Sequence, residues 1–253
     1  MKIVVLGSGS DGNSTLLEIG KVKILIDCGF TYSTLEKKLN EINVNPKDID
    51  YILITHDHGD HINGLKTFLK RNHPILCISK ILEEYSLGYE YNNAKYYEDE
   101  FLIENIFIKT LPTSHDAHDS YGFLIEHSNE SLVYITDTGY IHERNLEVIK
   151  NKKYYLIESN HDVEMLMNGR YPLYLQKRIL SNKGHLSNEI TGMYLSKIIG
   201  PNTKKIVLCH LSKDNNTKEI CLSTIYNFIK DFNKENILVA TQDELLEVDK
   251  WLK

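Results

Sequence analysis

Residues 1–90 alternate short apolar runs with amphipathic segments. The apolar runs predict β-strands over residues 2–7, 15–20, 22–29, 51–55 and 74–79. Apolar residues at helical spacing predict helices over residues 32–42, 61–72 and 80–88. The second and third strands flank Gly20 and Lys21, which indicates a β-hairpin.

The rest of the chain begins with further strands and then mixes strands with helices. Alternating or apolar runs predict strands over residues 105–116, 120–128, 131–139, 154–159, 204–212 and 236–241. Helical spacing predicts helices over residues 142–152, 162–180, 186–201 and 217–232. We expect an α/β fold in which two packed mixed β-sheets are flanked by helices, with residues 1–253 forming a single domain.

Composition and charge indicate where the protein is expected to act and what it is expected to bind. The net charge is −6, so no overall basic field indicates non-specific binding to nucleic acid, although a local basic groove remains compatible with this total. The start of the chain lacks the features of a signal peptide, and no stretch reaches the length of a membrane span. The four cysteines are scattered without a CxxC pair, which indicates free thiols. We therefore expect a cytoplasmic protein that does not associate with membranes.

The stretch "THDHGDH" concentrates metal-binding side chains directly after a predicted strand. His56 and His58 project to the same side of an extended segment, so both imidazoles can bind one ion, while Asp57 points away. Asp60 and His61 follow at the start of a helix and can serve a second ion. Two ions about 3.5–4 Å apart are a common arrangement for hydrolysing a phosphoryl or acyl group.

Further ligands are expected after other strands. His115, Asp137 and His210 each follow an apolar run, so each would emerge at the edge of a sheet. A single histidine there is more often structural, but the HxHxDH cluster favours the metal interpretation. The predicted set assigns His56, His58 and His115 to one ion and Asp60, His61 and His210 to the other, and Asp137 bridges both. The donors suit two divalent ions, Zn or Mn, with Fe or Co as alternatives.

These motifs, in this order, resemble the metallo-β-lactamase superfamily: "LIDCG", "THDHGDH", "SHD", "DTG" and "CHLS". The resemblance implies an αββα sandwich with two divalent ions at one edge of the sheets, and it makes Asp27 a supporting residue rather than a ligand. "LGSGSDGNS", "SHDAHDSYGF", "ESNHDVEML", "GRYP" and "KGHLSN" resemble the YycJ (WalJ) group more closely. The members of that group resemble nucleases related to RNase Z, RNase J and the β-CASP enzymes, and they are implicated in acting on DNA. The segment between Asp137 and His210 is too short for a β-CASP insertion, and no glycine-proline arm like that of RNase Z is present.

Two residues receive catalytic roles. Asp60 is expected to orient a hydroxide that bridges the ions and attacks phosphorus. His185 in "KGHLSN" precedes a predicted helix and is our candidate for protonating the leaving oxygen, by resemblance to the histidine motif of β-CASP nucleases. The alternative is that His185 is only a neighbour of a helix cap.

Substrate-binding roles are assigned to Ser10 and Asn13 of the glycine-rich loop and to Asn160 and His161 of "ESNHD", with His185 beside them. A purely structural role is an equal alternative for Asn160 and His161. His118 competes with His115 for the ligand position, and His115 fits the family position. His73, His127 and His142 lie beside polar turns and are expected to be solvated.

The leading hypothesis is a dinuclear metal-dependent phosphodiesterase, an exonuclease on DNA rather than RNA, which uses a metal-bridging hydroxide as its nucleophile. One alternative is a hydrolase of a small substrate, such as a thioester, lactone or small phosphodiester. The other is a non-catalytic metal-binding regulator.

Overall fold

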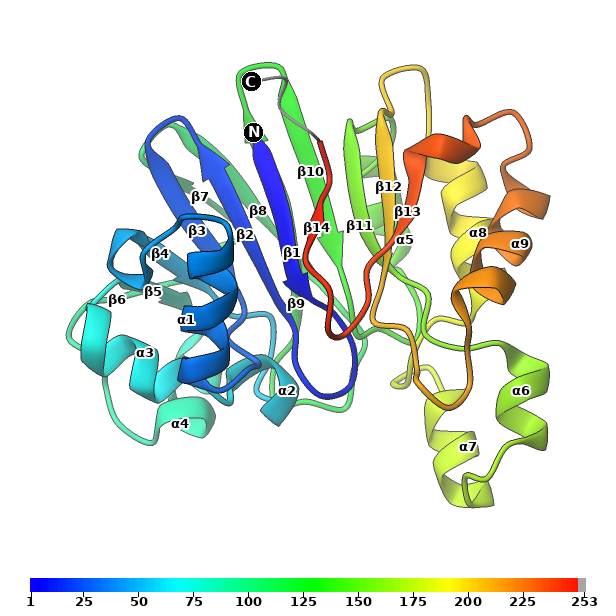
Figure 1. Ribbon diagram of the computed structural model, residues 1–253, viewed down its shortest axis with the longest axis horizontal. Helices are drawn as coiled ribbons and strands as arrows, with labels where there is room; N and C mark the ends of the chain where they lie inside the picture. Colours follow the sequence, from blue (N-terminus) through cyan, green and yellow to red (C-terminus); the bar gives the residue numbers. More distant parts are fainter. Residues whose placement is uncertain (250–253) are drawn as a thin grey trace.

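The computed structural model describes residues 1–249, in which fourteen strands form two seven-stranded sheets packed face to face (Figure 1). The first sheet comes from the N-terminal part of the chain, with one strand from the C-terminus. Its strands, in spatial order, are β14 (Leu246–Glu247), β1 (Lys2–Gly7), β2 (Ser14–Ile19), β3 (Val22–Ile26), β4 (Tyr51–Leu53), β5 (Ile75–Ile78) and β6 (Ala94–Tyr96).

The second sheet comes from the remainder of the chain. Its strands, in spatial order, are β13 (Ile237–Val239), β12 (Lys205–Cys209), β11 (Tyr154–Glu158), β10 (Glu130–Ile135), β9 (Tyr121–His127), β8 (Ile106–Pro112) and β7 (Glu100–Ile103). Both sheets are mixed: β1, β2 and β3 pair antiparallel and β3, β4, β5 and β6 parallel, while β7 to β10 pair antiparallel and β10 to β13 parallel. Parallel strands end at the same edge of a sheet, so their carboxyl ends bring loops together there.

Helices cover the outer faces of both sheets. The first sheet carries α1 (Tyr32–Glu41), α3 (Leu65–Asn72) and α4 (Lys80–Leu87), and the second carries α5 (Glu143–Val148), α8 (Asn188–Ile198) and α9 (Lys218–Phe228). The single-turn helix α2 (Gly59–Ile62), with α6 (Val163–Asn168) and α7 (Leu173–Ile179), lies at the lower edge in Figure 1. Two short 3₁₀ helices span Pro46–Asp48 and Lys234–Asn236. The predicted αββα arrangement is thereby confirmed.

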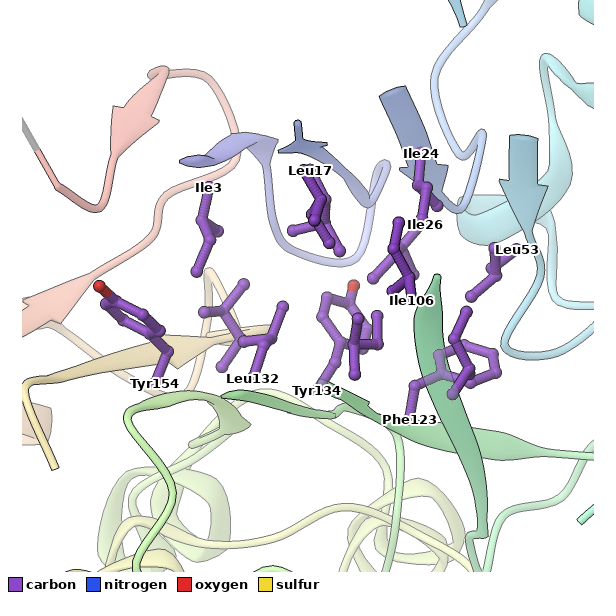
Figure 2. Close-up of a cluster of buried hydrophobic side chains, with 14 of the residues drawn as sticks. Ile3, Leu17, Ile24, Ile26, Leu53, Ile106, Phe123, Leu132, Tyr134 and Tyr154 are labelled. Carbon is purple, nitrogen blue, oxygen red and sulfur yellow. The ribbon is translucent and has the colours of Figure 1, made fainter. Parts of the chain in front are cut away.

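The core between the sheets explains why many strands are apolar on both faces. In β1, Ile3 packs against the second sheet, whereas Val4 packs against the helices that cover the first sheet. Figure 2 shows Leu17 and Ile26 of the first sheet facing Tyr134 of the second. Successive side chains of a strand point to opposite faces, so a strand buried on both faces lacks polar alternation.

Two helices predicted as continuous are interrupted. The predicted helix 61–72 breaks between α2 and α3, where the Gly64 N–H donates to the carbonyl oxygen of Cys28 at 2.8 Å. A Cβ at Gly64 would lie 2.3 Å from the carbonyl oxygen of Phe30, so this close approach requires glycine. The predicted helix 162–180 divides into α6 and α7, because Pro172 cannot donate an N–H and disfavours a helical conformation in the residue before it.

The structure also contains short strands at the edges of the sheets. The short strands β6, β7 and β14 were not predicted. Ser187 is the N-cap of α8, and its side chain accepts from the N–H of Ile190. All four cysteines are buried free thiols, as predicted. Within residues 1–249, no helix has both the length and the apolarity that crossing a membrane demands.

Candidate metal centre

The predicted ligands meet at one edge of the two sheets. They lie in loops that follow the carboxyl ends of β4, β8, β10 and β12, with α2 beside them (Figure 1). Four groups of side chains there each have their ligand atoms within 4.8 Å of one another. Three of these groups contain only predicted ligands: His56, His58 and His115; His56, His61 and Asp137; Asp60, His61 and His210.

The first group joins the "THDHGDH" stretch to the loop after β8. Nδ1 of His58 lies 3.2 Å from Nε2 of His115. The imidazole ring of His56 is centred 4.8 Å from that of His58 and 5.0 Å from that of His115. Three imidazoles therefore face one point, which is the arrangement predicted for one ion.

The second group lies on the other side of His56. Oδ2 of Asp60 is 3.4 Å from Nε2 of His61 and 3.4 Å from Nε2 of His210. Asp137 lies between the groups: Oδ2 is 3.2 Å from Nε2 of His61, and Oδ1 is 3.9 Å from Nε2 of His115. This position between both groups is the one the sequence predicted for a bridging carboxylate.

Three residues at this edge have left-handed backbone conformations. Asp27, Asp137 and His210 have φ angles of 62°, 54° and 56°. Each follows the carboxyl end of a strand, where β3, β10 and β12 end. Such conformations are unfavourable for residues other than glycine, and they persist where the surroundings fix them, often at functional sites.

Asp27 is completely buried and holds His61, a member of the second group, in place. Its Oδ2 lies 2.8 Å from Nδ1 of His61 and accepts from the Thr55 hydroxyl at 2.8 Å, while its Oδ1 accepts from the Thr55 N–H at 2.8 Å. Nδ1 of His61 is thereby engaged, and Nε2 faces Asp60 and Asp137. This is the supporting position that the family resemblance implies for Asp27.

Unpaired buried atoms test whether a metal fits the site. Among the described residues, Nε2 of His56 and Oδ2 of Asp137 are buried without a hydrogen-bond partner. An unsatisfied buried polar atom costs about 1–3 kcal/mol, and a cation would satisfy both atoms. These donors therefore fit a divalent transition metal.

The charges of three of the predicted ligands agree with this conclusion. Burial lowers the pKa of His56 well below its usual value and also lowers that of His115, which favours the neutral imidazole that binds metals. Burial alone would raise the pKa of Asp137, but the charges of His210 and His61 hold it well below its usual value. The ionised carboxylate then provides negative charge for a cation.

Glu158 is the functional residue that the sequence reading missed. It is the last residue of β11, and its side chain is completely buried. Oε1 lies 2.7 Å from Nδ1 of His185 and 3.1 Å from Nδ1 of His210. Oε2 accepts from the N–H groups of Thr138 at 3.0 Å and Leu186 at 3.1 Å. One carboxylate therefore joins three segments of the site.

Burial favours the neutral form of Glu158, yet its partners keep it ionised. Burial raises the pKa of the carboxyl, while the charge and hydrogen bond of His185 and the hydrogen bond of His210 lower it to about 2. His185 is partly exposed, with 19% of its side chain accessible, and its ring is centred 5.1 Å from that of His115. His185 thus lies at the mouth of the site. The sequence feature that could have indicated its partner Glu158 is a glutamate at the end of a predicted apolar strand.

The predicted substrate residues lie in three different environments. Ser10 is exposed in the loop between β1 and β2. Asn13 is 1% exposed, and its Nδ2 lies 3.1 Å from both Oδ2 of Asp60 and Nε2 of His61. Asn160 is buried and donates through Nδ2 to the carbonyl oxygen of His210 at 2.9 Å, and the neighbouring His161 is 1% exposed. Asn13 and Asn160 therefore make their contacts with the metal-binding segments themselves.

His118 is directed away from the ligand cluster. Its Nδ1 and its backbone N–H contact the carboxylate of Asp57, and half of its side chain is exposed. His115 holds the predicted ligand position, and His118 occupies the outer side of the same loop. Arg178 of α7 pairs with Asp116, whose Oδ1 is 3.5 Å from Nε2 of His115.

Comparisons with known proteins agree with this arrangement. The family model of the metallo-beta-lactamase superfamily matches residues 7–210. A protein named exodeoxyribonuclease WalJ, from Streptococcus pneumoniae, is 38% identical over 234 residues, which cover 89% of this chain and 87% of that protein. One named exodeoxyribonuclease YycJ, from Bacillus anthracis, is 35% identical over 233 residues, which cover 90% of this chain and 88% of that protein.

Solved structures show the same fold. The metallo-beta-lactamase fold protein YhfI from Bacillus subtilis superposes with a TM-score of 0.73 at 17% identity, covering 97% of this chain and 98% of that one. The short form of human tRNase Z superposes with a TM-score of 0.67 at 16% identity, covering 99% of this chain and 100% of that one. The chain belongs to the metallo-β-lactamase superfamily, within the group that includes WalJ and YycJ. The predicted family is confirmed, and this membership supports the prediction of a hydrolase.

Proposed function

We propose that this protein is a metal-dependent exonuclease that hydrolyses phosphodiester bonds of DNA, and that it works as a single domain. The observation that carries the proposal is the meeting of two ligand groups around Asp137, with the His185–Glu158 pair at their mouth. Relatives with 38% and 35% identity over most of the chain are named exodeoxyribonucleases, which favours DNA as the substrate. A DNA substrate also suits the predicted cytoplasmic location.

The ligand groups divide the proposed site between two ions. His56, His58 and His115 would hold one ion, Asp60, His61 and His210 would hold the other, and Asp137 would be shared. When bound, two divalent ions, Zn or Mn by the chemistry of these donors, acidify water and offset the negative charge of a phosphate.

The chain supplies the groups that orient water and move a proton. Burial raises the pKa of Asp60, but the charge of His61 and hydrogen bonds to His210 and His61 keep it far below its usual value. Asp60 is therefore an ionised acceptor that can orient an attacking water. Nδ1 of His185 is engaged by Glu158 at 2.7 Å, so Nε2 is the nitrogen left to give a proton to the leaving oxygen.

A panel of DNA and RNA substrates tests this proposal. Purified protein, loaded with Mn or Zn in parallel, is incubated with single- and double-stranded DNA and RNA labelled at the 5′ or the 3′ end. We expect stepwise shortening of DNA from one end, and no shortening by the Asp60→Ala variant. The proposal is wrong if the metal-loaded protein leaves every nucleic acid intact.

The same preparation separates the alternatives. Hydrolysis of thioesters, lactones or small phosphodiesters without cleavage of DNA would favour a small-substrate enzyme. Bound metal by elemental analysis, together with absence of any hydrolysis, would favour a non-catalytic metal-binding regulator.

A further inference from the structure

Beside the metal centre lies a stacked pair of exposed aromatic rings. The rings of Tyr85 and His118 are parallel within 11°, and their centroids are 3.4 Å apart. Tyr85 is 56% exposed, and 50% of the His118 side chain is exposed. A ring pair that leaves half of its surface in water contributes little to the core, so it is available to bind a ligand.

The pair is held firmly from below. Nδ1 and the backbone N–H of His118 both contact the carboxylate of Asp57, whose side chain is only 9% exposed. This fixes the plane of the imidazole ring against rotation. Tyr85 lies near the end of α4, whose first turn is capped by the Ser79 hydroxyl accepting from the N–H of Leu82. The contacts with Asp57 therefore set the orientation of the His118 ring, and Tyr85 is aligned with it by stacking.

The pair is also joined directly to the metal-binding segments. Asp57 stands between His56 and His58 in the chain, and His118 shares a loop with His115. The loop is closed at its base, where the Thr113 N–H donates to the carbonyl oxygen of Ser120 at 3.0 Å, and Ser120 forms a β-bridge with His56. A ligand stacked on the rings would consequently lie against the outer side of the loop that carries His115.

We propose that Tyr85 and His118 form a stacking platform for a nucleobase at the single-stranded end of the DNA substrate. This inference rests on the proposed function and adds the group that holds the nucleotide near the cleaved bond. Aromatic faces suit this role because every base can stack on them, so the enzyme can advance along DNA of any sequence. The net charge of −6 gives the protein no overall attraction for DNA, so binding would depend on local contacts.

Removing either the ring or the base provides the test. Binding of a fluorescently labelled single-stranded oligodeoxynucleotide with hydrolysis-resistant linkages to the metal-loaded protein is measured by anisotropy. A second oligonucleotide carries abasic tetrahydrofuran units at its end. The variants are Tyr85→Ala, Tyr85→Phe and His118→Ala. Tyr89→Ala is the matched control, because Tyr89 is also half exposed (50%) but lies beyond the end of α4.

We expect intact DNA to bind about 5- to 150-fold more tightly than abasic DNA, the range typical of one stacked base. Tyr85→Ala and His118→Ala should lose this preference, while Tyr85→Phe and Tyr89→Ala should keep it. Equal weakening of intact and abasic DNA would mean that the rings act only on the structure, and unchanged binding would mean that they do not contact DNA; either result overturns the platform.

The platform and the proposed function fail in distinguishable ways. If the protein shortens DNA but Tyr85→Ala keeps the preference for intact over abasic DNA, only the platform is wrong. If the protein neither binds nor shortens DNA, both are wrong. A separate assay of shortening, with Tyr85→Ala in the active protein, should show a raised KM with a smaller change in kcat.

Discussion

The two sheets contribute to the metal centre in different ways. The first sheet provides its ligand-type side chains from one short stretch after β4, from His56 to His61. The second sheet provides its own from four separate strand ends, which are those of β8, β10, β11 and β12. A local cluster can be recognised from spacing alone, whereas a distributed one exists only once the strands are aligned.

The two halves of the site, which are the ligands from the first sheet and those from the second, also differ in the residues that support them. On the first sheet, Asp27 binds His61 and Thr55 and so acts on a single segment. On the second sheet, Glu158 joins His185, His210 and the loop that carries Asp137. We therefore expect a substitution to have wider effects in the second half, and the following predictions test this from the largest effect to the smallest.

Asp137→Ala should have the largest effect, because Asp137 is the residue that contacts both ligand groups. We expect activity to fall by more than the roughly 10- to 100-fold typical of a supporting residue. Metal content, measured by inductively coupled plasma mass spectrometry, should fall with it. Asp231→Ala, at an exposed turn, serves as the control. Full metal content and full activity in Asp137→Ala would show that Asp137 does not bridge the halves.

Glu158→Gln should lower kcat by about 100-fold with little change in KM, at the lower end of what general acid catalysis contributes. The amide is neutral and places N–H groups against donors, so it no longer orients His185. Metal affinity should fall as well, because Nδ1 of His210 loses its anionic partner, so kcat is measured at saturating metal. A His185→Ala substitution added to Glu158→Gln should cost little more, since residues that act as a unit are not additive. If the losses in kcat from the two substitutions add, His185 and Glu158 do not act as a unit.

Asp27→Asn should weaken metal affinity by roughly 10- to 100-fold, because Nδ1 of His61 loses its anionic partner. The effect is confined to the first half, so excess metal should restore activity. Titration of the metal-free variant, with activity as the readout, measures this. If saturating metal fails to restore Asp27→Asn yet restores Glu158→Gln, the contrast between the two halves is reversed.

His127→Asn should change activity by less than about 2-fold, within the range of ordinary surface substitutions. His127 ends β9 at the edge opposite the metal centre, and a strand of this length spans about 20 Å. Its Nε2 contacts only the side-chain amide of Asn105, at 3.1 Å, among the described residues. A large loss of activity would show that the far edge of the sheets influences the site.

The sequence predicted the local half of the site more fully than the distributed half. The spacing within "THDHGDH" indicated two ions because the side-chain directions in an extended segment are known. His115, Asp137 and His210 could be proposed because each follows an apolar strand, and the structure brings them to the same edge. Their relative order depended on sheet topology, which spacing alone does not determine.

Glu158 was missed for a physical reason. It occupies the last position of a strand whose other residues are all buried, and a carboxylate there is stable only with several partners. Those partners come from distant segments, so no local sequence pattern predicts them. The helix break at Gly64 was missed for a related reason, since the packing against Phe30 became visible only in three dimensions. The break before Pro172 could have been predicted from the sequence, because a proline inside a helical pattern ends or interrupts the helix.

The left-handed backbone at Asp27, Asp137 and His210 has an evolutionary consequence. Each such residue destabilises the fold by about 1–3 kcal/mol, which is a substantial fraction of the stability of an average domain. A glycine at these positions would relieve the backbone strain but would remove the side chain on which the chemistry depends. Selection for activity must therefore act continuously against selection for stability at these three strand ends. A lineage that no longer needed the reaction would be expected to lose them first.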